Sequence, residues 1–163
     1  MSYDELPPYQ LRSATDGDFA FMRAVYGSTR EEELAVTGWS REQKDAFLDH
    51  QFGAQTQYYR EHRPGAEWQI IVIEGHDAGR LVVYRRASEH RIVDIALLPA
   101  FRGRGVGSDI LRELQRTAAA DGCLLSIHVE CNNPARNLYE RLGFLPAGEP
   151  GEVYQLMEWR SGA

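Results

Sequence analysis

The segment Arg102-Gly-Arg-Gly-Val-Gly107 has the residue types of an anion-binding loop. It follows an apolar run and precedes a stretch of helical periodicity, so a strand should lead through this loop into a helix. Glycines at 103, 105 and 107 allow backbone N–H groups to converge, and a helix N-terminus adds about half a positive charge. Arg102 and Arg104 add guanidinium donors, with Val106 and Ser108 in the first helical turn. We therefore expect a site for phosphate or pyrophosphate.

Three other interpretations of this loop fit its residues less well. A Walker-type phosphate loop requires a lysine after the last glycine, and the segment contains none. A dinucleotide-binding loop requires a third glycine where Ser108 stands, and several repeated βαβ units. A glycine turn without a ligand would leave the charges of Arg102 and Arg104 repelling one another. The anion site is thus the favoured interpretation.

The elements that must position the loop follow from periodicity and turn residues. Up to residue 62 we expect a short strand, a helix capped by Thr15 and Asp18, a short helical piece, and a long helix capped by Ser40. Their expected ranges are 9–14, 15–26, 30–36 and 41–62. The long helix should carry Phe47, Ala54 and Tyr58 on one side.

Beyond residue 62 the pattern changes to strands. Three strands over residues 68–74, 79–86 and 90–98 should form an antiparallel meander, with residues 75–78 as a turn. A helix over 105–120 and a strand over 124–130 complete one parallel crossover. Asn133 and Pro134 should open another helix, and residues 152–159 a last strand. The fold class is therefore α+β or mixed α/β.

Two motifs together resemble a known family. Arg102-Gly-Arg-Gly-Val-Gly107 fits the first signature of the GNAT superfamily of acetyl-CoA-dependent N-acetyltransferases, and Asn133-Pro-Ala-Arg-Asn-Leu-Tyr-Glu-Arg-Leu-Gly-Phe144 is similar to the second. The resemblance covers roughly residues 68–145. It implies a largely antiparallel sheet of about 6–7 strands flanked by helices, with a splayed central strand pair. It also implies one domain over 1–163, with acceptor-binding helices at about 15–62 and a cofactor-binding core at about 68–145.

The resemblance further implies how acetyl-CoA would be held. The pyrophosphate would lie on the loop, and the pantetheine arm would pair with the backbone of Ile95, Ala96 and Leu97. The thioester would lie where this strand splays from residues 126–130. Asn133 would contact the cofactor, with Asn132 as the alternative. A metal is not expected, because the histidines and cysteines lack metal-ligand spacing.

The resemblance places Tyr139 where the family has its general acid. A phenol, with a pKa near 10, is close to a thiol in basicity, so it suits protonation of departing CoA. The other interpretation is a core aromatic sharing a helix face with Ala135 and Leu142. For the base, His128 lies where some relatives carry a catalytic glutamate. Its alternatives are Glu130, Asp94 and water, or a histidine with no catalytic role; Cys131 as a nucleophile lacks a paired base.

The acceptor pocket should form from the first helices and the last strand. Tyr26, Glu33, Trp39, Asp94 and Tyr154 are candidates because aromatic and acidic side chains suit a cationic amine. The amine itself stays open among small molecules, peptides and proteins. An exposed last strand would favour a homodimer. The rival function is a non-catalytic module that binds or senses acyl-CoA on the same scaffold.

Composition excludes several other classes. The 163 residues carry a formal net charge of −6, which disfavours binding to nucleic acid or anionic lipid. Neither a membrane span nor a leader segment is expected. Cys123 and Cys131 should both be free thiols, in keeping with a cytoplasmic location.

Overall fold

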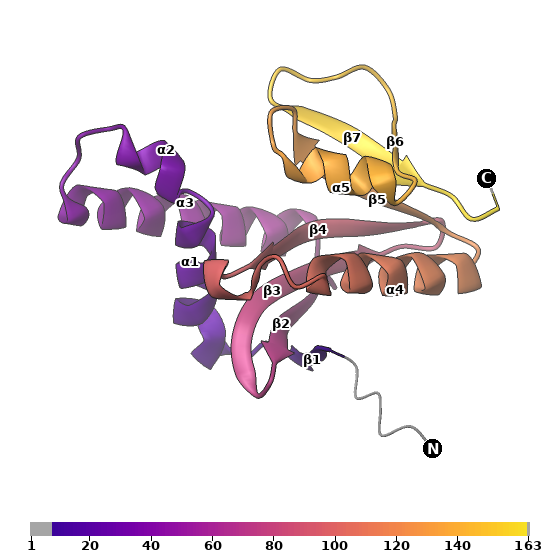
Figure 1. The fold of residues 1–163 in the computed structure, drawn as a ribbon, viewed down its shortest axis with the longest axis horizontal. Helices are drawn as coiled ribbons and strands as arrows, with labels where there is room; N and C mark the ends of the chain where they lie inside the picture. Colours follow the sequence, from indigo (N-terminus) through magenta and orange to yellow (C-terminus); the bar gives the residue numbers. More distant parts are fainter. Residues whose placement is uncertain (1–7, 163) are drawn as a thin grey trace. The chain divides into compact units, whose positions relative to one another are not determined.

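Seven strands in the described part of the chain form one sheet in the order β1-β2-β3-β4-β5-β7-β6 (Figure 1). The computed structural model describes residues 8–162; the predicted absence of a leader falls partly on residues outside this range. The strands are β1 (Gln10–Ser13), β2 (Glu67–Ile73), β3 (His76–Arg85), β4 (Glu89–Leu97), β5 (Leu124–Glu130), β6 (Leu145–Pro146) and β7 (Tyr154–Trp159). The helices are η1 (Asp16–Asp18), α1 (Phe19–Ser28), α2 (Glu31–Ala35), α3 (Arg41–His62), η2 (Pro99–Phe101), α4 (Val106–Ala120) and α5 (Ala135–Arg141). The predicted mixed α/β class is confirmed.

The chain forms two compact units, which are described separately. The first contains the residues up to Val82 together with Asp94–Arg102. The second contains Val83–Val93 and the residues from Gly103 onward. The chain therefore passes from one unit to the other inside β3, inside β4, and between Arg102 and Gly103.

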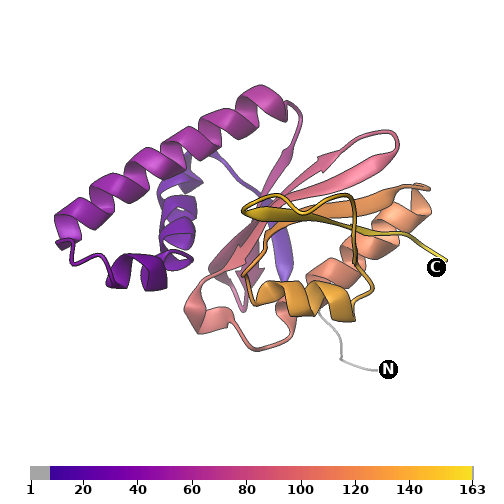
Figure 2. The same ribbon diagram turned by 90° about the horizontal axis from the view of Figure 1, so that it is seen from above.

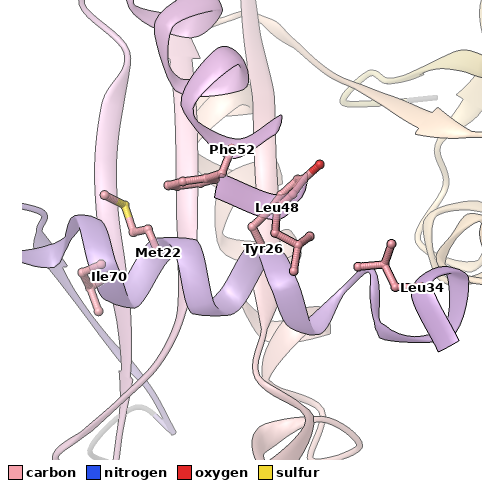
Figure 3. Close-up of a cluster of buried hydrophobic side chains, with 6 residues drawn as sticks. All are labelled: Met22, Tyr26, Leu34, Leu48, Phe52 and Ile70. Carbon is pink, nitrogen blue, oxygen red and sulfur yellow. The ribbon is translucent and has the colours of Figure 1, made fainter. Parts of the chain in front are cut away.

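In the first unit, helices α1 and α3 enclose an apolar core. Figure 1 shows α1 crossing α3, and Figure 2 shows α1 and α2 on the same side of α3. Tyr26 and Phe52 pack with ring centroids 5.6 Å apart, and Phe19 lies 5.1 Å from Phe52. The core cluster, drawn in Figure 3, consists of Met22, Tyr26, Leu34, Leu48, Phe52 and Ile70. Its ring and alkyl contacts hold the helices on β2.

The predicted helix starts in this unit are confirmed. The Thr15 side chain and Asp18 form a capping box around η1, so α1 begins after one 3₁₀ turn. Ser40 and Gln43 form a second capping box at α3. The predicted side of α3 was wrong, however: its buried residues are Leu48, Phe52 and Thr56, whereas Ala54 and Tyr58 are exposed.

The turn between β2 and β3 is shorter than predicted. Glu74 and Gly75, with φ of 52° and 79°, form a two-residue turn, so β3 begins at His76 rather than at residue 79. Positive φ at both positions is what a hairpin turn of type I′ needs. Further along β3, a Cβ added to Gly79 would lie 2.2 Å from the carbonyl oxygen of Ala96. Only glycine allows β3 and β4 to approach so closely there.

In the second unit, α4 covers the strands with one apolar face. Val106, Ile110, Leu114 and Ala118 are buried at the predicted spacing. The parallel pairing of β4 with β5 runs from Glu89 opposite Leu124 to Ile92 opposite Ile127, which confirms the predicted crossover. Both strands continue beyond these pairs, to Leu97 and Glu130.

The last strand of the second unit is an inner strand for part of its length. β7 pairs antiparallel with β5 from Tyr154 to Trp159, and with the unpredicted two-residue β6 at Met157 and Glu158. The sequence predicted a homodimer on the basis of an exposed last strand. In the structure β6 covers the outer edge of β7 only at Met157 and Glu158. The homodimer stays a prediction. None of the helices in residues 8–162 is long and apolar enough to cross a membrane.

Candidate active site

The glycine loop (residues 102–107) begins with an arginine tied to the strand before it. The Nε of Arg102 donates to the carbonyl oxygen of Leu97 at 2.9 Å, and Nη2 reaches Oγ of Ser28 at 3.4 Å. Gly103 and Gly105 have φ of 78° and 80°, the left-handed region that side chains disfavour. The backbone geometry of the loop thus requires glycine at two of its three glycine positions.

Gly107 has a different reason to be glycine. It lies in the first turn of α4, and its φ is not positive, so its backbone conformation does not require glycine. A Cβ added here would meet no atom within 4 Å, so internal packing does not require glycine. The first N–H groups of a helix have no carbonyl partner within it. An open surface without a side chain beside these donors fits the close approach of an anionic group such as pyrophosphate.

The residues predicted for the pantetheine arm lie at the end of β4 in the first unit. Ile95, Ala96 and Leu97 are half-buried. The chain leaves the strand through a hydrogen bond from Leu98 N to Ala78 O of 2.8 Å. These residues immediately precede η2 and the glycine loop, so the predicted cofactor residues follow one another along the chain.

Tyr139 lies on α5 with its ring buried. The residue is 6% exposed, and its ring packs edge-on against Phe144 with centroids 5.7 Å apart. The ring therefore belongs to the core, and this packing fixes the direction of the phenol. Asn133 accepts a hydrogen bond from Ala135 N at 2.9 Å through Oδ1, but α5 begins at Ala135 with Pro134 as its N-cap, one residue later than predicted.

His128 on β5 is held by an arginine of the neighbouring strand. Arg91 Nη1 lies 3.1 Å from Nδ1 of His128, while Nε donates to Ser126 Oγ at 2.7 Å. Arg91 Nη2 donates to Glu89 Oε2 at 2.9 Å, and Ser126 Oγ also donates to this oxygen. The guanidinium thus has an anchor at each of its three nitrogens.

Glu89 is the acid of this cluster and is ionised over a wide pH range. Burial alone would raise the pKa of Glu89. Hydrogen bonds from Ser126 and Arg91, the charge of Arg91, and a hydrogen bond from Arg86 together outweigh burial and lower the pKa to about 2. Glu89 therefore carries the negative charge that balances Arg91 throughout the neutral range.

The lowered pKa of Glu89 predicts a dependence of stability on pH. In the unfolded chain a glutamate titrates near pH 4.3, so the stabilisation by ionised Glu89 is present above about pH 4.3 and is lost as the pH falls towards about 2. We expect Glu89→Gln to lower the free energy of unfolding at pH 7 and to flatten its fall across this acidic window. Urea unfolding at a series of pH values measures both effects.

Glu113→Gln is the matched control, because Glu113 forms an exposed pair with Arg116 one turn away on α4. Its unfolding free energy should follow the wild-type pH dependence. A Glu89→Gln protein whose stability falls as steeply as that of the wild type between pH 4.3 and 2 would contradict the assignment.

A second buried ion pair lies in the first unit. Arg80 is 1% exposed; its Nε donates to Asp94 Oδ2 at 2.5 Å and its Nη2 to Gln55 Oε1 at 2.8 Å. Its guanidinium also lies 5.1 Å from the ring centroid of Phe52. Asp94 is therefore committed to holding a buried cation, which weakens its candidacy as a base. Among residues 8–162, no group of three or more His, Cys, Asp and Glu is arranged to hold a metal.

Comparison with known proteins decides the family. Residues 29–144 match the acetyltransferase (GNAT) family. The chain belongs to this family. The matched range contains the glycine loop, His128 and Tyr139, and it also includes helices α2 and α3 of the N-terminal region, which no sequence motif had identified.

One relative is similar to this chain in sequence over about half of its length. A Bacillus subtilis (strain 168) protein, provisionally named ribosomal protein bS18-alanine N-acetyltransferase, is 31% identical over 87 residues, which are 52% of this chain and 58% of that protein. The chain thus aligns with somewhat over half the length of this relative.

Among solved structures, PaiA N-acetyltransferase of Thermoplasma acidophilum in complex with coenzyme A superposes with a TM-score of 0.70 at 14% identity, covering 93% of this chain and 98% of that one. Arabidopsis thaliana Naa50 with the bisubstrate analogue CoA-Ac-MVNAL gives a TM-score of 0.62 at 13% identity, covering 94% and 99%. These structures show that the fold is the GNAT fold.

The predicted acceptor residues of this GNAT chain have varied surroundings. Tyr26 is buried, and its hydroxyl donates to Gln51 Oε1 at 2.8 Å. Glu33 is paired with Arg30 at 2.8 Å. Trp39 and Tyr154 are 39% and 49% exposed, so their rings offer surface to a ligand. Tyr154 lies opposite Glu130 in the β5–β7 pairing.

Sequence reasoning missed Arg91, Glu89 and Ser126 as site residues. They meet because Arg91 lies opposite Ser126, and Glu89 two residues before it, in the parallel pairing of β4 with β5. The available signal was a charged residue on either side of His90 in a strand that is otherwise largely apolar. Recognising it would have required the register between strands 35 residues apart.

Proposed function

We propose that this protein transfers the acetyl group of acetyl-CoA to a primary amine by direct attack of the amine. The observation that carries this proposal is Gly107, a helical glycine with open space in place of a side chain, beside the N-terminal N–H groups of α4. The GNAT membership of residues 29–144 supports it. The two compact units would act as one catalytic domain.

The cofactor contacts follow the chain in order. The backbone of Ile95, Ala96 and Leu97 would pair with the amides of the pantetheine arm. The glycine loop would then bind the pyrophosphate, with Arg104 and Ser108 at its rim, and Asn133 would make a further contact. Bound acetyl-CoA would supply an activated thioester, and holding it beside the amine can lower the barrier by about 7–11 kcal/mol. The coenzyme A complex of the PaiA relative supports this cofactor class.

Tyr139 is the proposed general acid. Its buried ring, packed on Phe144, would present one phenolic proton in a fixed direction. Donation of this proton to the sulfur of departing CoA would avoid a free thiolate. Because the pKa values of phenols and thiols are close, the proton passes with little loss of driving force.

His128 is the proposed base, with Glu130, Asp94 and water as the alternatives. The ring would take the proton at Nδ1, the nitrogen that accepts from Arg91 and therefore carries a lone pair. The proposed acceptor contacts are Tyr26, Glu33, Trp39, Asp94 and Tyr154.

A peptide or protein amine is the preferred acceptor. The name of the Bacillus relative and the peptide analogue bound to Naa50 both support this class. We place the protein in the cytoplasm, a proposal supported by Cys123 and Cys131, which are both free thiols. A homodimer is compatible with this assignment.

The test combines cofactor binding with transfer. Wild-type protein should bind acetyl-CoA in calorimetry and acetylate one class of a panel of peptide N-termini, lysine peptides, polyamines and aminoglycosides. Gly107→Ala is expected to raise the KM for acetyl-CoA about tenfold, a loss of about 1.4 kcal/mol in binding, because the methyl group fills the open surface. Alanine should not destabilise the helix itself.

Gly53→Ala is the matched control, since Gly53 is a helical glycine of α3 that also has open space around it. It should leave the KM unchanged. Tight binding of acetyl-CoA without transfer to any amine would favour the non-catalytic module, and binding of NAD without CoA would overturn the proposal entirely.

A further inference from the structure

The contact between Arg91 and His128 fixes the proton on the imidazole ring. A guanidinium is always charged in proteins and has only donors, so its Nη1 donates and Nδ1 of His128 accepts. Nδ1 therefore bears no hydrogen, and a neutral ring must carry its hydrogen on Nε2. A proton arriving at Nδ1 would face an N–H of Arg91, so it can bind only after this hydrogen bond is broken.

Two of the three guanidinium nitrogens of Arg91 are held by groups other than the ring. Its side chain is 13% exposed, and Ser126 and Glu89 hold its other two nitrogens at 2.7 and 2.9 Å. Glu89 stays ionised because its pKa is lowered to about 2. The guanidinium thus remains beside His128 across the neutral range, both as a hydrogen-bond donor and as a positive charge.

We propose that Arg91 is a positioning residue that keeps His128 neutral, with its hydrogen on Nε2, until an acceptor amine displaces the Nη1 donor from Nδ1. This inference rests on the proposed role of His128 as base. In the step, an N–H bond of the acceptor ammonium breaks, its proton bonds to Nδ1, and the amine keeps the electron pair with which it attacks. Arg91 keeps its charge, and its repulsion then drives the proton from the imidazolium to water.

Other ionisable groups share this face of the sheet with His128. The strand register places Glu130 on the same face of β5, with Tyr154 and Glu158 opposite on β7. Arg160 pairs with Glu158 and Arg86 with Glu89. Removal of Arg91 would leave Glu89 short of its principal cation, which also favours a protonated ring. Loss of the positive charge of Arg91 and loss of the cation that balances Glu89 both favour protonation of the His128 ring. Removal of Arg91 is therefore expected to raise the proton affinity of His128.

The direct test is a titration of the ring nitrogens by NMR of the full chain labelled with ¹⁵N-histidine, with His128 assigned from the spectrum of His128→Gln. In the wild type near pH 7.5 we expect unprotonated Nδ1 and protonated Nε2. In Arg91→Gln the ring should take up its second proton at higher pH, with an affinity about tenfold greater, because a like charge is removed. Arg86→Gln, which alters a partner of Glu89 that does not contact His128, should titrate like the wild type.

Two results would overturn the inference: a wild-type ring with hydrogen on Nδ1, or an Arg91→Gln ring that titrates where the wild type does. If Arg91→Gln does not fold, Arg91→Met, which also removes the charge, replaces it, and the wild-type measurement remains decisive on its own.

The pH dependence of steady-state kinetics tests whether His128 acts as the base in the reaction. The acidic limb of kcat/KM against pH should move to higher pH in Arg91→Gln by the same amount as the NMR titration, but not in Arg86→Gln. A limb that stays in place while the NMR titration moves would show that His128 is not the base, and the inference would fall. If wild-type protein acetylates no amine, the proposed function fails by itself, whatever the ring titration shows.

Discussion

Replacing Tyr139 by phenylalanine is expected to lower kcat for acetyl transfer by about 10²–10⁴, the usual contribution of a general acid. The substitution removes one hydroxyl and keeps the ring that packs against Phe144, so the core should be retained. Without the phenolic proton, CoA must leave as a thiolate. The KM for acetyl-CoA should change little, because the proposed cofactor contacts lie in the glycine loop and at the end of β4. Steady-state kinetics with the best acceptor from the amine panel measures both constants.

The mechanism behind this loss can be isolated with a better leaving group. An acetyl thioester of a more acidic thiol needs less protonation, so it should react with Tyr139→Phe and with the wild type at more similar rates. Tyr58→Phe removes a phenol from an exposed position of α3 and should behave as the wild type. A Tyr139→Phe enzyme with unchanged kcat would leave Tyr139 as a core aromatic only.

Replacing Gly79 by alanine is expected to have the largest effect on stability. The added Cβ would lie 2.2 Å from Ala96 O and 3.0 Å from Leu97 Cα, both backbone atoms that cannot rotate away. The end of β4 must shift, at a cost of about 1–3 kcal/mol or more. A loss of about 3 kcal/mol corresponds to a fall in Tm of about 6–12 °C for a chain of this size.

The same change should weaken the cofactor site. Ala96 and Leu97 are proposed to pair with the pantetheine arm, so a displaced strand end should also raise the KM for acetyl-CoA. Thermal unfolding and kinetics of the surviving fraction separate the two effects. Gly53→Ala again provides the control, since it has room for a methyl group. A Gly79→Ala protein within about 0.5 kcal/mol of the wild type, the usual range for surface substitutions, would show that the two strands are not packed this closely.

The sequence predicted most accurately those elements whose ends carry a local signal. Ser40 with Gln43 marks the start of α3, and Gly105 in the left-handed conformation marks that of α4. The β2–β3 turn was misplaced because His76 and Asp77 have the polarity of loop residues. In the structure Asp77 accepts a hydrogen bond from Arg12 on β1 at 3.0 Å, a partner that is distant in sequence.

The candidate site likewise has one part that carries a local sequence signal and another that depends on contacts between distant residues. The glycine loop and Tyr139 lie in short contiguous motifs. The residue types of the loop predict anion binding, whereas the role proposed for Tyr139 came from the resemblance to the family. Arg91 and Glu89 come from β4, and Ser126 and His128 from β5. None of these four residues belongs to a recognisable sequence motif of its own. Only the register of β4 against β5 brings a guanidinium to the histidine ring. Contacts of this kind depend on tertiary pairing, which a single sequence does not specify.

The division of β3 and β4 between the two compact units has a consequence for synthesis on the ribosome. The first unit cannot close until residues 94–102 have emerged, because they complete the segment that ends at Val82. The second unit begins with residues 83–93, which must wait for the chain from Gly103 onward. The first unit is therefore complete only once residue 102 has emerged, and the second only after the rest of the chain, in keeping with domains that fold in order during translation. Translational pausing shortly before residue 102 emerges would hold the nascent chain with its first unit incomplete.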